Sequence, residues 1–344
     1  MVKMLKNLWL YSLRFYLRLG LFFYFRTFKV VGKENIPADK SLLVLGNHQS
    51  ALIDPLLLAV VFPQFAYYLT RAAVFKKNIV RMLLNSVNML PVFRIRDGWS
   101  NLTNNNPVFE KCRELLHEKR TIVIFPEGSH NLRRTVRPLS KGFTRIVLDT
   151  LEAYPDTDMY LLPVGFNYEN AVNFPDSASV YFGKPIRTAN LLMGNIHENV
   201  ITLKNTVHYE LTKLTTHIPA ENYDEQLSKL KSLNADFLNP VEVNACLQNE
   251  NDCFKREVSK NRLELLKPLV YLNLLFPVAI WRLFVKPKIK EAEFVATFRF
   301  AIAVVLIPLW LLVITCVLLA YFGSLVAGIY LLVSILLMLL YVKA

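Results

Sequence analysis

Cysteine is scarce in this 344-residue sequence: there are four, and none belongs to a C-x-x-C pair. A disulfide framework or a zinc site is signalled by paired or closely spaced cysteines. Cys316 moreover lies inside an apolar run. The sequence therefore predicts free thiols at Cys112, Cys246, Cys253 and Cys316, as is usual in a reducing compartment, and no metal site.

The N-terminus lacks the features of a cleaved secretory signal. Arg14 and Arg18 interrupt its apolar stretch, and no A-x-A cleavage site follows. Lys3, Asn7, Arg14 and Arg18 instead fall within about 60° of one another on a helical wheel. This predicts an amphipathic helix over residues 1–26 that lies in a membrane interface with its basic stripe toward the headgroups. A buried amphipathic helix is the alternative.

Charge is absent from two long runs near the C-terminus. Residues 301–322 contain no charged side chain, and at 1.5 Å per residue they span about 33 Å, enough for a hydrocarbon core of about 30 Å. Gly323 and Ser324 provide a turn before a second uncharged run at 325–342. Lysine and arginine residues precede the first of these two runs, and Lys343 follows the second. The sequence predicts a transmembrane helical hairpin at 299–344 with both ends in the cytoplasm.

Basic residues are in excess, giving a formal net charge of +13, and 53% of the residues are hydrophobic. An anionic membrane leaflet, an acidic carrier protein or a phosphate-bearing substrate would be attracted by this field. No recognised nucleic-acid-binding module accompanies the charge, so nucleic acid is not an expected partner. We expect a membrane protein whose globular domain lies on the cytoplasmic face.

Residues 27–218 have the pattern of an α/β domain. Apolar runs typical of strands (FKVVG, SLLVLGN, TIVIFPEG, MYLLPVGF and ASVYFG) alternate with helical patterns (NPVFEKCRELLHEK and GFTRIVLDTLEA). This predicts a mixed, largely parallel sheet flanked by helices. Residues 219–268 are polar and are predicted to be a helical connector. Residues 269–298, an interrupted apolar segment followed by lysines, are predicted to be re-entrant or interfacial.

Two polar side chains interrupt the apolar stretch LGNHQSALIDPLLLAV at residues 45–60. His48 follows an expected strand, and Asp54 comes six positions later. A carboxylate that fixes the tautomer of a histidine and stabilises its imidazolium is what general-base catalysis needs. Asp54 followed by Pro55 is also a good helix start, with aspartate as the N-cap. The sequence predicts a proton-handling pair at the mouth of an apolar cleft, and capping is a compatible alternative.

Two further segments end in polar residues after an expected strand. NMLPVFRIRDG places Arg94 and Arg96 where their guanidinium groups could bind a phosphate or carboxylate. TIVIFPEGSHNLRRTVRPLSKGF continues into a loop in which Gly128 permits a positive φ. Ser129, backbone N–H groups and nearby arginines such as Arg133 could bind a phosphate there. A solvated strand end and a basic surface loop are the alternatives.

These three segments, in this order and with LLPVGFNY after them, resemble the glycerolipid acyltransferase superfamily, which includes lysophosphatidic-acid and glycerol-3-phosphate acyltransferases. The resemblance covers about residues 28–187. Here five residues rather than four separate His48 from Asp54, and F-P-E-G-S-H replaces F-P-E-G-T-R, so His130 stands where an arginine is usual. Both features, with the lysine-rich KPKIKEAEFVATFRF, are similar to a subset of glycerol-3-phosphate and dihydroxyacetone-phosphate acyltransferases.

The resemblance implies an O-acyltransferase of phospholipid biosynthesis. It would move a fatty acyl group from acyl carrier protein or coenzyme A to a hydroxyl of lysophosphatidate or glycerol-3-phosphate, with membrane lipids as partners. His48 would act as general base and Asp54 would hold its ring. The thioester is a co-substrate, and no cofactor is expected. Substrate contacts would come from Asn47, Arg94, Glu127, Gly128, Ser129, His130 and Arg133.

Other functions remain open at this point. The sequence lacks a G-x-S-x-G nucleophile elbow, so no covalent acyl-enzyme is required. The same His48 and Asp54 pair could hydrolyse a thioester, or a relative of this family could acylate a lyso-aminolipid. A non-catalytic, membrane-tethered lipid-binding protein is the alternative from another class.

Overall fold

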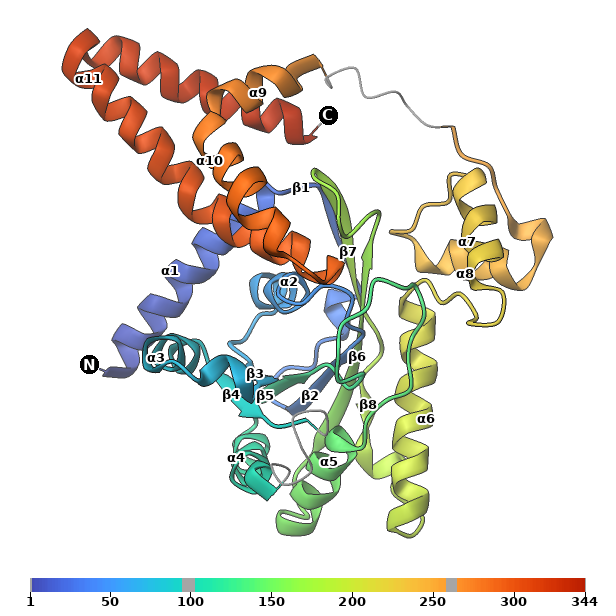
Figure 1. Ribbon diagram of the computed structural model, residues 1–344. Helices are drawn as coiled ribbons and strands as arrows, with labels where there is room; N and C mark the ends of the chain where they lie inside the picture. The colour runs from blue at the N-terminus through green and yellow to red at the C-terminus, as the bar shows by residue number, and fades with distance from the viewer. Residues whose placement is uncertain (1, 95–102, 258–264, 344) are drawn as a thin grey trace.

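The computed structural model describes residues 2–94, 103–257 and 265–343 (Figure 1). Its centre is an eight-stranded sheet in the order β1-β7-β6-β2-β5-β3-β4, with β8 also paired to β6. β7 and β8 run antiparallel to β6, and the other pairings are parallel. The expected mixed, largely parallel sheet is confirmed. The strands are β1 Phe25–Val31, β2 Ser41–Gly46, β3 Tyr67–Arg71, β4 Met89–Val92, β5 Thr121–Ile124, β6 Met159–Tyr168, β7 Asp176–Phe182 and β8 Ile186–Arg187.

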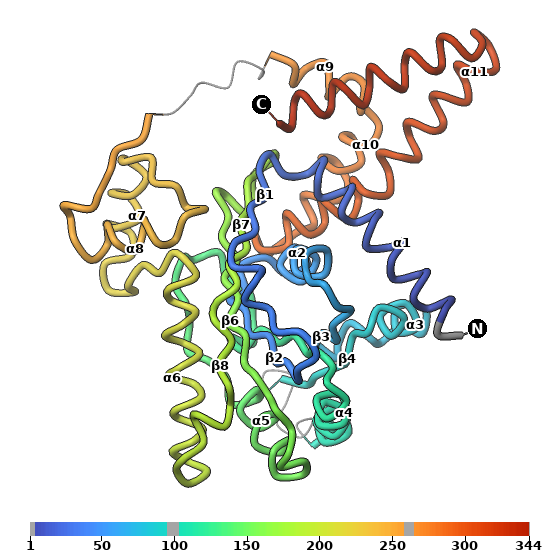
Figure 2. The backbone as a smooth tube through the Cα atoms, turned by 180° about the vertical axis from the view of Figure 1, so that it is seen from behind, coloured from blue at the N-terminus to red at the C-terminus, as the bar shows by residue number. Residues whose placement is uncertain are grey.

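Helices cover both faces of this sheet (Figures 1 and 2). Those that the sequence predicted as NPVFEKCRELLHEK and GFTRIVLDTLEA are α4 and α5. The sequence did not predict the short strand β3 or the helix α3. The helices are α1 Val2–Phe22, α2 Ile53–Val61, α3 Asn78–Ser86, α4 Asn106–His117, α5 Gly142–Ala153, α6 Ile196–Leu214, α7 Tyr223–Ser232, α8 Pro240–Gln248, α9 Lys267–Asn273, α10 Leu275–Ala279 and α11 Val295–Lys343.

The central strand β2 shows how the sheet separates two cores. All six of its residues are buried, and successive side chains of a strand point to opposite faces. Leu42 and Val44 pack into the core beneath α2, whereas Leu43 and Leu45 pack into the core shared by α4, α5 and α6. A parallel strand covered on both sides is expected to be apolar throughout, which is why SLLVLG carries no alternation.

The connector region has a small core of its own, formed by α7 and α8. The expectation of four free thiols is wrong here, because Cys246 and Cys253 form a disulfide across a separation of seven residues. The end of α8 and the turn after it bring their Cα atoms within 4.5 Å, a distance that a disulfide can bridge. Cys112 is buried and Cys316 is exposed, and both are free.

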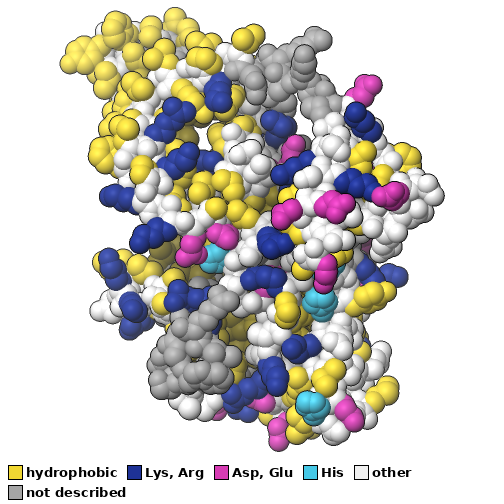
Figure 3. All heavy atoms as spheres, turned by 45° about the vertical axis from the view of Figure 1, so that its right-hand side comes forward, with side chains coloured by type: hydrophobic (Ala, Val, Ile, Leu, Met, Phe, Trp, Pro, Cys, Tyr) yellow, Lys and Arg dark blue, Asp and Glu magenta, His cyan; other side chains and the backbone are white. Residues whose placement is uncertain are grey.

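The C-terminal helix α11 is broken at Gly323, where φ is 83° and ψ is 174°. Figure 1 shows its two arms meeting at the upper left. Figure 3 shows apolar side chains gathered at that end of the molecule, with lysine and arginine below them. Within the described ranges, residues 292–343 are the one helix long and apolar enough to cross a bilayer. The helical segments 267–273 and 275–288 are long and apolar enough only if they count together as one span, and they are bent by 96° relative to each other.

Both ends of α11 return to the junction between α1 and β1. At the first arm, Arg299 donates to the Tyr24 hydroxyl at 3.0 Å. At the end of the second arm, Lys343 Nζ donates to the carbonyl oxygens of Phe25 at 2.7 Å and Arg26 at 3.4 Å. The start and the end of α11 therefore lie close to the same residues at the beginning of the sheet, and the bend at Gly323 lies away from them.

The predicted N-terminal helix is present as α1, but the expected direction of its basic stripe is wrong for Arg14. The Arg14 guanidinium donates to the carbonyl oxygens of Pro63 at 3.3 Å and Gln64 at 3.0 Å, and it lies 4.0 Å from the centre of the Phe65 ring. Arg14 therefore faces the domain. A helical wheel places basic residues around the helix but cannot tell which side of the helix the rest of the protein covers. An interfacial role for residues 1–26 stays a prediction.

The fold predicts that Gly165 of β6 tolerates no side chain. A Cβ atom there would lie 2.1 Å from the carbonyl oxygen of Leu214 at the end of α6. Gly165→Ala should force helix and strand apart, at about 1–3 kcal/mol of stability. The midpoint of thermal unfolding in detergent should fall by several degrees. Gly142→Ala is the control, because its Cβ would meet only Ser140 Oγ at 3.9 Å. Equal midpoints for the two variants would contradict the close approach.

Candidate active site

The candidate site lies where parallel strands end. β2, β4, β5 and β6 run in the same direction through their pairings, so their carboxyl ends meet at one edge of the sheet, the usual place for a site in such folds. His48 follows β2, Arg94 follows β4, and the loop 127–130 follows β5. β6 ends at Tyr168. Segments far apart in the sequence thus bring their polar residues to one edge.

The His48 and Asp54 side chains are paired as predicted. Asp54 is fully buried, at 0% exposed, and its Oδ2 lies 2.8 Å from His48 Nδ1. The same oxygen accepts from the backbone N–H groups of Gln49 at 2.9 Å and Ser50 at 2.8 Å. An ionised carboxylate only accepts hydrogen bonds, so Nδ1 carries the proton in this pair. His48 Nε2 is left as the nitrogen that can act as a base.

The alternative in which Asp54 is an N-cap is wrong. Helix α2 begins at Ile53, its N-cap position is Leu52, and no side chain caps it. The Asp54 carboxylate turns back to the loop that precedes the helix, because the N–H groups of Gln49 and Ser50 and the His48 ring meet it there. The carboxylate therefore organises the loop that carries His48.

Tyr168 completes this group, and no role was predicted for it from the sequence. Its hydroxyl donates a short hydrogen bond to Asp54 Oδ1 from 114 residues away. Burial, and then the charge of Asp54, raise the pKa of Tyr168 well above its usual range, so the hydroxyl keeps its proton and remains a donor. Tyr168 is the last residue of the segment LLPVGFNY, but no sequence pattern around it indicates a contact with Asp54.

Aromatic rings hold the His48 imidazole. Phe125 stacks on it with ring centres 4.2 Å apart, and the His130 ring lies edge-on at 5.7 Å. Gly46 makes room for this arrangement, because a Cβ there would lie 2.8 Å from the Phe166 ring and 3.2 Å from the Phe125 ring. The His48 side chain remains 14% exposed, so the ring is fixed yet reachable.

The loop after β5 is held by two arginines. Gly128 adopts φ 72°, and its carbonyl oxygen accepts from Arg94 at 2.9 Å. Arg137 donates to the Glu127 carboxylate at 2.8 Å and to Ser129 Oγ at 2.7 Å. Burial raises the pKa of Glu127, and the charge of Arg137 opposes that shift. Arg137, which the sequence placed only in a basic loop, thus fixes two of the predicted substrate contacts.

Asn131 joins this loop to the histidine, because its N–H donates to the His48 carbonyl oxygen at 3.0 Å. His130 is covered on its outer side by residues that precede α11. Its ring lies 4.6 Å from that of Phe294, and its Nε2 lies 3.6 Å from the Glu291 carboxylate. Burial and the neighbouring His48 lower the pKa of His130, which favours a neutral second imidazole beside the pair.

Two other predicted contacts are engaged elsewhere. The Asn47 amide accepts from Phe166 N–H at 2.7 Å and donates to its carbonyl oxygen at 3.1 Å, so it ties β2 to β6. The Arg133 guanidinium lies 4.1 Å from the centre of the Tyr223 ring in α7. The structure therefore brings Arg94 and the loop 127–130 to the pair, and it turns Arg133 toward the connector. Arg96 lies outside the described residues.

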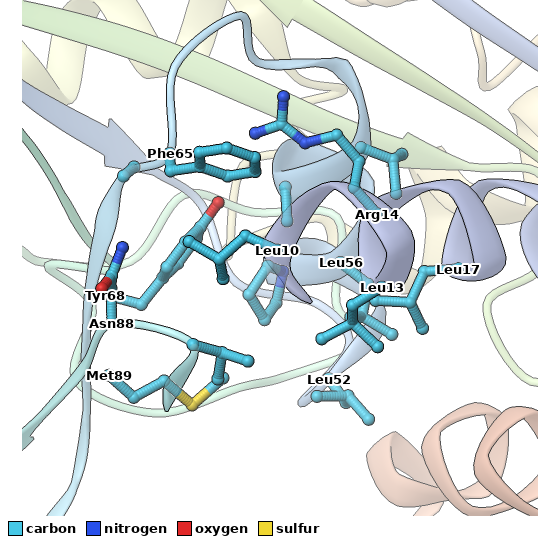
Figure 4. Close-up of a pocket in the computed structure, with 15 residues that line it drawn as sticks. Leu10, Leu13, Arg14, Leu17, Leu52, Leu56, Phe65, Tyr68, Asn88 and Met89 are labelled. Atoms are coloured by element: carbon cyan, nitrogen blue, oxygen red, sulfur yellow. The ribbon is translucent and has the colours of Figure 1, made fainter. Parts of the chain in front are cut away.

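An apolar pocket of about 120 Å³ lies between α1, α2 and β3 (Figure 4). Leu52, Pro55 and Leu56 line it, but His48 and Asp54 do not, so it is not the apolar cleft expected at the pair. Within the described ranges, no group of three or more His, Cys, Asp or Glu residues could hold a metal ion.

The site geometry predicts that Tyr168→Phe destabilises the fold. The variant removes the hydroxyl that donates to the buried Asp54 Oδ1, which should cost about 1–3 kcal/mol. The midpoint of thermal unfolding in detergent should fall, whereas Tyr209→Phe on the exposed side of α6 should leave it unchanged. An unchanged midpoint for Tyr168→Phe would mean that water or another donor satisfies Asp54.

Residues 27–167 match the family model described as Acyltransferase. Glycerol-3-phosphate O-acyltransferase 1 of Saccharomyces cerevisiae is 32% identical over 90 residues, which are 26% of this chain and 12% of that protein. The 1-acyl-sn-glycerol-3-phosphate acyltransferase of Borreliella burgdorferi is 28% identical over 121 residues, 35% of this chain and 46% of that protein. The corresponding Bacillus subtilis enzyme is 29% identical over 119 residues, 34% of this chain and 55% of that protein.

Among solved structures, the 1-acyl-sn-glycerophosphate acyltransferase of Thermotoga maritima has a TM-score of 0.46 at 19% identity, covering 62% of this chain and 83% of that chain. The matched segments of the curated relatives span from 12% to 55% of their own length. The match to the family model contains His48, Asp54, Arg94 and the loop 127–130, and Tyr168 follows it directly. Residues 27–167 therefore form a domain of the acyltransferase family.

Proposed function

We propose that the protein is a membrane-bound O-acyltransferase that moves a fatty acyl group from a thioester to a hydroxyl of a glycerol-phosphate acceptor. The observation that carries the proposal is the His48 and Asp54 pair, 2.8 Å apart at the carboxyl edge of the sheet, inside a domain of the acyltransferase family. Relatives named as glycerol-3-phosphate and 1-acyl-sn-glycerol-3-phosphate acyltransferases support this acceptor class.

In the proposed reaction, His48 Nε2 takes the proton of the acceptor hydroxyl as its oxygen attacks the thioester carbonyl carbon. The new carbon–oxygen bond forms, the carbon–sulfur bond breaks, and the proton passes to the leaving thiolate. Asp54 holds the ring and stabilises the imidazolium that forms in between. A positioned base of this kind supplies about 10²–10⁴-fold of rate, and the orientation of the two substrates supplies much of the rest. The proposed reaction needs no cofactor.

We place the phosphate of the acceptor near Arg94 and the loop 127–130. Arg94 already reaches the Gly128 carbonyl oxygen. Apart from the adjoining residues, no atom of the described part of the chain lies within 4 Å of where a Gly128 side chain would be. Backbone can therefore be approached closely at this point. The donor is proposed to be acyl carrier protein or coenzyme A, to which the basic charge of the chain would be attracted.

We further propose that α11 enters a bilayer as a helical hairpin and leaves the domain on the cytoplasmic face. The broken helix at Gly323 and the return of both its ends to the junction of α1 and β1 support this topology. The lysines before α11 and at its end favour the cytoplasmic side for both. The pair α9 and α10 would then be re-entrant.

The first prediction from this function concerns His48. Purified protein in detergent, given acyl carrier protein and coenzyme A thioesters with a panel of acceptors, should yield an ester lipid identified by mass. His48→Ala should lower kcat by about 10²–10⁴-fold while the protein stays in the membrane fraction. His197→Ala, on the exposed start of α6, should leave kcat unchanged. Near-normal turnover by His48→Ala would refute the assigned base, and free fatty acid as the product would indicate a hydrolase.

The second prediction separates the two arginines. Removing a charge-assisted hydrogen bond to a phosphate costs about 1.5–3 kcal/mol, or about 10–100-fold in affinity. Arg94→Ala and Arg133→Ala should each raise the KM for a phosphate-bearing acceptor more than the KM for the thioester. The effect should be larger for Arg94, because Arg133 lies on Tyr223. A variant whose acceptor KM is unchanged removes that arginine from the phosphate site.

A further inference from the structure

Helix α3 has an apolar side that none of the described residues covers. None of its nine residues, 78–86, is buried, and Ile79, Met82 and Leu83 are 82%, 71% and 53% exposed. Spacings of three and four residues place these side chains on one face of a helix. Burying a side chain of this kind is worth about 1.5–3 kcal/mol, so leaving three of them in water is costly.

Basic residues border this apolar face. Lys76 and Lys77 precede α3, and both are exposed. Arg81 is exposed on the opposite side of the helix, about 200° around it from Ile79 at 100° per residue. An apolar strip with lysines before it and an arginine on the opposite side of the helix is the pattern of a helix that lies flat in the interface of an anionic bilayer. Long basic side chains reach the headgroups there.

The C-terminal end of α3 is hydrogen-bonded to α1. Trp9 Nε1 of α1 donates to Ser86 Oγ at 3.2 Å, and Lys6 donates to the Asn88 amide oxygen at 2.7 Å. α1 has an exposed apolar row of its own at spacings of three and four residues. Its members are Met4, Leu8, Tyr11, Phe15, Leu19 and Phe22.

The other end of α1 packs on the first arm of α11. The Tyr16 hydroxyl donates to the Val304 carbonyl oxygen, and a Cβ on Gly20 would lie 3.0 Å from Val304 and 3.3 Å from Phe300. α1 therefore bridges α11 and α3, as the two backbone views show (Figures 1 and 2). The exposed apolar surface of α3 continues through α1 to the helix that is apolar enough to cross a bilayer.

We propose that α3 is a second membrane-inserting element, with Ile79, Met82 and Leu83 in the acyl region of an anionic leaflet and Lys76 and Lys77 among the headgroups. The proposal rests on the proposed membrane attachment through α11 and is independent of the acyl-transfer step. It has a consequence for the site, because α3 leads into β4, and β4 leads to Arg94. The depth of α3 would then set how far from the bilayer surface an acceptor phosphate is held.

The test places a probe on the full-length protein. Met82→Cys and, as a matched control, Met193→Cys are made in a Cys316→Ala background, since Cys112 is buried and Cys246 is bonded to Cys253. Met193 is 86% exposed and lies just before α6. The start of α6 lies at the opposite end of the molecule from α11 in Figures 1 and 2. Each cysteine is labelled with an environment-sensitive fluorophore. The protein is then reconstituted into vesicles of phosphatidylcholine and phosphatidylglycerol.

The probe at position 82 should emit at shorter wavelength than the probe at 193. A lipid that carries a nitroxide on its acyl chain should quench it several-fold more strongly. Equal quenching at the two positions would overturn the proposal, and so would a blue shift at 82 without lipid quenching, because a second protein copy would then cover α3. Loss of acyl transfer with strong quenching at 82 would count against the proposed enzyme and not against this membrane contact.

Discussion

The site depends on one fully buried carboxylate. Asp54 Oδ2 meets the His48 ring and the backbone N–H groups of Gln49 and Ser50, and Oδ1 meets the Tyr168 hydroxyl. A charge out of reach of water is tolerated only when its hydrogen bonds are complete. The requirement therefore fixes the loop after β2, the start of α2 and the end of β6 relative to one another. The orientation of His48 is a product of that whole arrangement rather than of a single contact.

The sequence predicted the parts of the fold whose signals are strong and local. β2 and β5 are short apolar runs because parallel strands covered on both faces are expected to be apolar. β3 was missed because YYLTR mixes aromatic, polar and basic residues over only five positions. The disulfide between Cys246 and Cys253 was missed for a different reason: a spacing of seven is no motif, and the pairing arises from the turn that follows α8.

The candidate site divides in the same way. His48 and Asp54 lie six residues apart, so their pairing could be predicted from the sequence. Tyr168 joins them from 114 residues away, and Asn47 reaches Phe166 across 119 residues, so neither contact has a local signal. A helical wheel likewise showed that Arg14 and Arg18 share a side of α1, but which side packs on Phe65 is decided by tertiary contacts.

The hydrogen bond from Lys343 to the Phe25 carbonyl oxygen joins residues 318 positions apart in the sequence. The order of translation therefore decides when this contact can form. The first residues of β1 leave the ribosome early, whereas the lysine that binds their carbonyl oxygens is made only after both arms of α11. The nascent domain therefore holds its N-terminal edge without this contact until both apolar arms have been synthesised. The contact between the end of α11 and the start of β1 can therefore form only after the most apolar segment of the domain's surroundings has been made.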